Sequence, residues 1–115
     1  MPIVFVVARD WTLRVTVRAE LRERGIDALG IESPEDVNRA VAGGQMPAVV
    51  VLEATTENAA DPAIRKLIER VPAVLVASRM ETVSLPPVAC VLYRPVRIHE
   101  IVTRVTELIE KGHTA

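Results

Sequence analysis

The stretch Pro47-Ala48-Val49-Val50-Val51-Leu52-Glu53 is an aliphatic run that ends abruptly in a carboxylate. An apolar run without a polar break is typical of a strand covered on both faces, as in parallel sheets packed between helices. In such sheets functional groups gather at the carboxyl ends of the strands. Glu53 is therefore expected at the end of a buried strand, in a position suited to a functional role.

Similar apolar runs lie on both sides of this stretch and alternate with amphipathic segments. Five strands are predicted, at residues 3–7, 26–31, 48–52, 74–77 and 90–93. Four helices are predicted, at residues 11–24, 34–42, 62–71 and 98–109. Between residues 78 and 89 at most one short turn is expected, because Pro86-Pro87 cannot sit inside a helix or a central strand. The alternation predicts an α/β fold with a parallel sheet and helices on both of its faces.

The chain length and the residue composition favour a single domain without a nucleic-acid or membrane partner. A chain of 115 residues usually forms one core, and a net charge of -1 from 14 basic and 15 acidic residues creates no field of one sign. The single cysteine, Cys90, cannot form an internal disulfide. Signal-peptide features are lacking, and no apolar run approaches the ~20 residues that cross a bilayer. We therefore expect a cytoplasmic protein of bacterial type.

The predicted strands deliver a particular set of residues to the carboxyl edge of the sheet. These are Ala8, Arg9 and Asp10 after the first strand, Glu53 after the third, Ala77 and Ser78 after the fourth, and Arg94-Pro95 after the fifth. Together with the chain length and the order of these elements along the sequence, this set resembles the receiver domain of two-component response regulators over nearly the whole chain. The best local matches are residues 47–53, on the strand that ends in the phosphoacceptor Asp, and residues 93–96, on the Lys-Pro motif.

The resemblance implies a three-layer flavodoxin-like (CheY-like) fold over residues 1–115, with strand order 2-1-3-4-5. It also implies that the fourth helix of receivers, which would lie between Ala77 and Arg94, is degenerate here. It also assigns site positions. The acidic pair that holds Mg²⁺ in receivers falls on Ala8-Arg9, so that only the following Asp10 is acidic, and the phosphoacceptor position holds Glu53. Since a guanidinium cannot ligate a cation, Mg²⁺-assisted phosphoryl transfer is expected to be lost. Neither a metal, a cofactor nor an enzymatic activity is expected, although Asp10 and Glu53 leave a weak metal site as an alternative.

The remaining receiver positions also depart from the pattern. The switch Ser/Thr position falls on Ala77, or on Ser78 after a shift of one residue, and the aromatic switch position falls on Val91. Arg94, followed by Pro95, replaces the Lys. Because guanidinium groups can bind carboxylates bidentately, we expect Arg9 and Arg94 to hold Glu53 in the space of the metal.

The function implied by the resemblance is a phosphorylation-independent protein-protein interaction module in signal transduction. Its expected partners are proteins of a signalling pathway, with a homodimer through the helix at residues 98–109 as a further hypothesis. The alternative is a small anionic-ligand-binding domain that uses Arg9 and Arg94. Trp11 is expected to be half-buried at the start of its helix.

Overall fold

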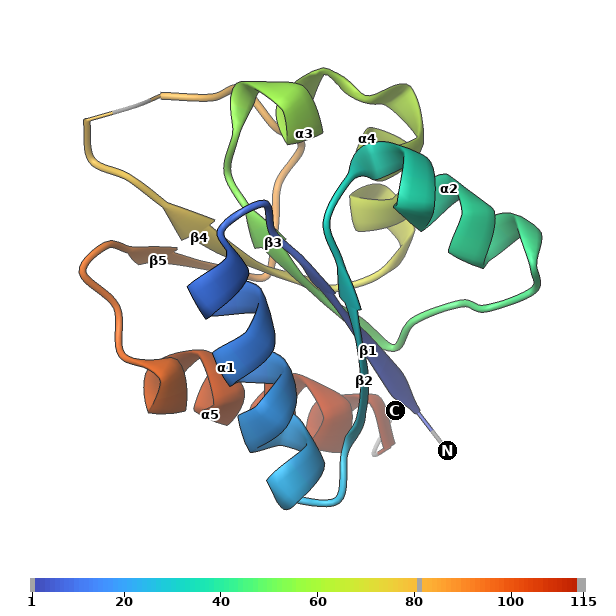
Figure 1. The fold of residues 1–115 in the computed structure, drawn as a ribbon, viewed down its shortest axis with the longest axis vertical. Helices are drawn as coiled ribbons and strands as arrows, with labels where there is room; N and C mark the ends of the chain where they lie inside the picture. Colours follow the sequence, from blue (N-terminus) through green and yellow to red (C-terminus); the bar gives the residue numbers. More distant parts are fainter. Residues whose placement is uncertain (1, 81, 114–115) are drawn as a thin grey trace.

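The protein is described by a computed structural model that covers residues 2–80 and 82–113. A five-stranded parallel sheet forms its middle layer, in the order β2-β1-β3-β4-β5 (Figure 1). The strands are β1 Ile3–Val7, β2 Asp27–Ile31, β3 Val49–Glu53, β4 Ala73–Ala77 and β5 Cys90–Tyr93. The helices are α1 Trp11–Glu23, α2 Pro34–Ala42, α3 Thr56–Ala60, α4 Pro62–Arg70 and α5 Ile98–His113. The predicted fold class and strand order are confirmed.

Two apolar clusters, one on each face of the sheet, form the core. On one face α1 and α5 pack against side chains that alternate along the strands, such as Val4, Val6 and Val51. On the other face α2, α3 and α4 cover the intervening side chains, such as Phe5 and Leu52. This coverage of both faces explains why the central strands are apolar at every position before Glu53.

The helix starts follow from side-chain caps. Ser33 and Asp61 each accept a hydrogen bond from the backbone N–H of the third residue of the helix that follows, α2 or α4, and each is followed by a Pro, as predicted. Asp10 caps α1 in the same way, which places a carboxylate at the edge of the sheet. None of the described residues between 78 and 89 belongs to a helix or a strand, in line with the expected effect of Pro86-Pro87.

Two expectations about individual elements require correction. Trp11 is 66% exposed and is not half-buried, because it lies outside the stripe of α1 that faces the core. The short helix α3 was not predicted, since its five residues carry no apolar stripe. Along the described parts of the chain, no helix combines the length and apolar character needed to span a membrane.

Candidate functional site

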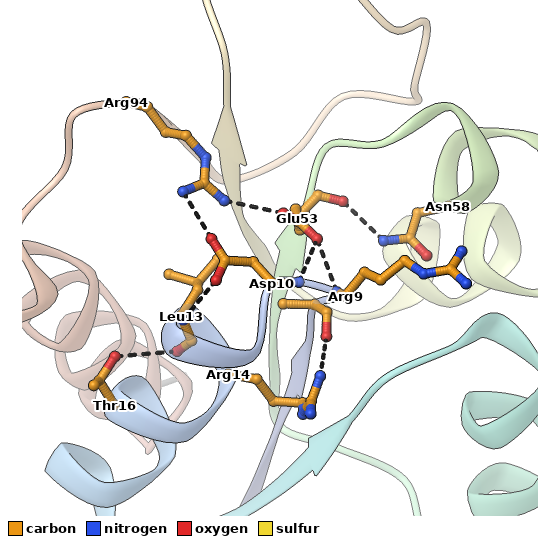
Figure 2. A network of polar contacts seen from close by, with 9 residues as sticks. Arg9, Asp10, Leu13, Arg14, Thr16, Glu53, Asn58 and Arg94 are labelled. Atoms are coloured by element: carbon orange, nitrogen blue, oxygen red, sulfur yellow. Dashed lines mark hydrogen bonds and ion pairs between the residues drawn. The ribbon is translucent and has the colours of Figure 1, made fainter.

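Three strand ends meet at one point on the carboxyl edge of the sheet. β1 leads into Ala8, Arg9 and Asp10, its neighbour β3 ends at Glu53, and Arg94 directly follows β5 (Figure 2). Although β4 lies between β3 and β5, the long side chain of Arg94 reaches across it. The sheet order therefore brings together residues that are 41 to 84 positions apart in the sequence.

The carboxylate of Glu53 is engaged on both oxygens. Oε1 accepts hydrogen bonds from the backbone N–H groups of Arg9, at 2.8 Å, and of Asp10, at 3.3 Å. Oε2 accepts a hydrogen bond from Nη2 of Arg94 at 3.0 Å. Only 14% of the Glu53 side chain is exposed. Because the carboxylate is both sheltered and hydrogen-bonded, it is held in one orientation across the first, third and fifth strands.

Arg94 bridges two carboxylates. While Nη2 binds Glu53, Nη1 lies 3.2 Å from Oδ2 of Asp10 (Figure 2). The predicted contact between Arg94 and Glu53 is present. The two terminal nitrogens of the guanidinium bind two different carboxylates, however, and do not bind Glu53 bidentately. A guanidinium thus lies between the acidic side chains of the site.

The predicted contact between the guanidinium of Arg9 and Glu53 is wrong. The Arg9 side chain turns away from the Glu53 carboxylate (Figure 2). Its Nη1 pairs with Oε2 of Glu57 at 2.6 Å in an exposed ion pair. Arg9 holds Glu53 through its backbone N–H alone. Glu57 was not predicted as a partner because it lies in the first turn of α3, the helix that the sequence pattern did not indicate.

Asn58, in α3, supports the backbone of Glu53 and was also not predicted from the sequence. It is the buried polar side chain of the described core, 3% exposed, and its Nδ2 donates to the backbone carbonyl of Glu53 at 2.9 Å. Its own backbone N–H donates to the hydroxyl of Thr55, the cap of α3. A Thr three residues before Asn58 is a helix-start signal that could have indicated this turn.

The backbone N–H of Leu13, which donates to Asp10 at 3.2 Å, lowers the pKa of the Asp10 carboxyl below its ordinary value. Partial burial raises this pKa, while the charge and the hydrogen bond of Arg94 lower it further. Asp10 is therefore an anion at neutral pH, and it serves both as the cap of α1 and as a partner of Arg94.

Comparison with solved structures defines the fold. A response regulator receiver protein from Burkholderia phymatum superposes with a TM-score of 0.77 at 16% identity, covering 96% of each chain. A CheY-like receiver domain protein from Methanospirillum hungatei JF-1 gives 0.76 at 14% identity, covering 99% of this chain and 98% of the other. The chain has the receiver fold. No protein-family model matches the sequence, and neither does any curated protein.

Within the receiver fold, the positions that the resemblance assigns to switching lie beside the site without entering its ion network. Ala77 is buried at the end of β4, and its carbonyl accepts the backbone N–H of Arg94 at 2.8 Å. Ser78 accepts a hydrogen bond from the backbone N–H of Met80. Val91 is 41% exposed on β5, and the peptide bond between Arg94 and Pro95 is cis.

The site contains two carboxylates and one guanidinium. Across the described residues, no group of three or more His, Cys, Asp and Glu side chains could hold a metal ion. Each of the two acids instead contacts Arg94, and the backbone N–H groups of Arg9 and Asp10 supply the remaining donors to Glu53. The arrangement is therefore an ion network in which each charged side chain, Asp10, Glu53 and Arg94, has a partner of opposite charge.

Proposed function

We propose that this protein is a receiver-like module that binds other proteins of a signalling pathway without being phosphorylated. The observation that carries the proposal is the guanidinium of Arg94, which lies 3.0 Å from Glu53 and 3.2 Å from Asp10. The proposed role is cytoplasmic and non-enzymatic, with no cofactor and with neither nucleic acid nor membrane as a partner.

The ion network argues against phosphoryl transfer on Glu53. A Mg²⁺ ion requires several oxygen ligands in a near-octahedral arrangement. To bind between Asp10 and Glu53, it would have to displace Arg94 from both carboxylates, and Arg9 supplies no oxygen from its side chain. A carboxylate that already accepts three hydrogen bonds is also a poor nucleophile, since attack would break them.

The same contacts weigh against the alternative of an anion site built by Arg9 and Arg94. Arg94 already faces two carboxylates, and Arg9 is paired with Glu57. The negative charges of Asp10 and Glu53 would repel an incoming anion, and both arginines already have carboxylate partners. The geometry therefore favours the interaction module over the ligand-binding domain at this site.

The surface best suited to a protein partner lies on β5 and the segment that follows β4. Val91 and Tyr93 are 41% and 46% exposed, and they line a hollow of about 560 Å³ between the sheet and this segment. Exposed aromatic and aliphatic side chains around a hollow are typical of interaction sites. The apolar stripe of α5, in contrast, packs into the core through Ile101, Val102 and Val105. A homodimer would therefore use β5 more than α5.

The test is an amide NMR titration with Mg²⁺ and then with beryllofluoride, which stands in for an acyl phosphate. We expect the resonances of Asp10, Glu53 and Arg94 to remain unchanged at millimolar concentrations. Saturable shifts at these residues would overturn phosphorylation independence.

Light scattering of the wild type and of Tyr93→Ala at matched concentrations tests the homodimer. A dimeric mass for the wild type and a monomeric mass for the variant would support association through β5. Two monomeric masses would reject the homodimer and leave other proteins as the expected partners.

A further inference from the structure

A second candidate site lies between α2 and α4. These two helices lie on the face of the sheet opposite α1 and α5 (Figure 1). The site is a hollow of about 300 Å³ over Val37, Val41 and Leu67. Two small side chains, Ala42 on α2 and Ala63 on α4, contribute to its walls. Because alanines stand where longer side chains would fill the space between the helices, an apolar groove stays open to solvent.

The groove has cations on one side and no lining carboxylate. Lys66 and Arg70 lie one helical turn apart on α4, and both line the hollow. The lining residues from α2 are neutral, and among them only Asn38 is polar. In the described structure neither Lys66 nor Arg70 is among the residues that form ion pairs. Their charge is therefore available to a ligand, in contrast to that of Arg94.

We propose that this groove binds a small amphiphilic anion, with an apolar chain over Val37, Val41 and Leu67 and a carboxylate or phosphate head group against Lys66 and Arg70. An apolar body with an anionic end complements a hollow whose floor is apolar and whose rim is positive. The volume falls at the lower end of the range of small-molecule sites. An amphipathic helix would need three or four successive anchoring pockets, which a single hollow of this size does not supply.

The test is a titration of the whole chain with decanoate and, separately, with decyl phosphate. Binding is monitored by amide NMR at probe concentrations below micelle formation. We expect saturable shifts for residues that line the groove, such as Ala42, Ala63 and Leu67, with both probes. Decyltrimethylammonium, which has the same tail and the opposite charge, is expected to bind at least several-fold more weakly.

Two variants separate the contributions of charge and shape. Lys66→Gln/Arg70→Gln is expected to weaken decanoate binding about 5- to 20-fold, because two partly exposed ion pairs are lost. Ala63→Leu fills the groove without a change of charge and is expected to abolish the shifts. Arg22→Gln/Arg97→Gln removes the same charge from exposed positions outside the groove and should leave the affinity unchanged.

Three results would overturn the proposal. They are no shift with decanoate or with decyl phosphate, equal binding of decyltrimethylammonium, and an equal loss of affinity in the Arg22→Gln/Arg97→Gln control. Since Asp10, Glu53 and Arg94 do not line the groove, these results are independent of the Mg²⁺ and beryllofluoride titration. Failure of one proposal therefore leaves the other standing.

Discussion

Replacement of Arg94 by Met would remove the charge that joins Asp10 and Glu53 while it keeps much of the apolar stem. The two carboxylates would then share one site without a cation. We expect the variant to fold, because Arg94 lies at the rim of the core with 37% of its side chain exposed, and to be less stable than the wild type at neutral pH.

The expected loss follows from the burial of each pair. Glu53 is only 14% exposed, so its hydrogen bond from Arg94 belongs to the charged class, worth roughly 1.5–3 kcal/mol. The Asp10 pair is about one third exposed on both sides and should contribute about 1 kcal/mol or less. A total loss of about 2–3 kcal/mol would lower the midpoint of thermal unfolding of a domain of this size by roughly 10 °C.

The assay is a double-mutant cycle of Arg94→Met and Glu53→Gln, measured by chemical unfolding at pH 7. We expect a coupling energy of about 1–2 kcal/mol between the two positions. Arg97→Met is the matched control, because Arg97 is exposed nearby and forms none of the ion pairs of the site, and it should change stability by less than about 0.5 kcal/mol. A coupling energy near zero, or an equal loss in the control, would refute the ion network as a stabilising element.

Three further predictions concern the residues around this network. Asn58→Ala removes one donor from the carbonyl of Glu53 and should cost about 1–2 kcal/mol in a denaturant titration, whereas an unchanged midpoint would show that the buried amide is dispensable. Asp10→Asn keeps a good helix cap but loses the charge opposite Arg94. Because the pKa of Asp10 is lowered in the folded state, the stability gap to the wild type should be constant at neutral pH and close as the pH falls below 3.8; a gap that widens in acid would contradict this. Trp11→Ala should leave the melting temperature nearly unchanged, since the indole is 66% exposed, and a large drop would mean that it packs in solution.

The strands could be predicted because burial on both faces leaves an unbroken apolar run at each central strand, whereas their order in the sheet was expected only from the resemblance to receiver domains. The central strands β1, β3 and β4 are apolar along their length except for Glu53 at the end of β3. The observed bounds differ from the predicted ones by one residue at β2, β3 and β4. Local signals were sufficient for α2 and α4 as well, since a cap followed by Pro marks each start. Trp11 illustrates an available signal that was misjudged, because it falls outside the helical stripe of Leu13, Val17 and Leu21.

The site could be predicted only in part, because its contacts depend on backbone geometry and on one helix of five residues. Arg9 was expected to contribute its side chain, but the chain direction after β1 points its N–H at Glu53 and its guanidinium toward Glu57. A side-chain pattern carries no information about such backbone donors. Glu57 and Asn58 were missed together with α3, whose start depends on the hydroxyl of Thr55.

The departures from the receiver pattern make physical sense as a set. Taken singly, Arg9 in place of an acid and Glu53 in place of Asp each suggest a damaged phosphorylation site. In the structure, Glu53 reaches the N–H groups of the β1–α1 connection and Arg94 at the same time, and Arg94 reaches Asp10 as well. Arginine suits this position better than lysine would, because two separate nitrogens of one planar group face two carboxylates. The ion network thereby joins the ends of β1, β3 and β5 through side-chain and backbone contacts. If the site takes no phosphoryl group, as we propose, regulation of this protein would act through its surfaces, at β5 or at the groove between α2 and α4.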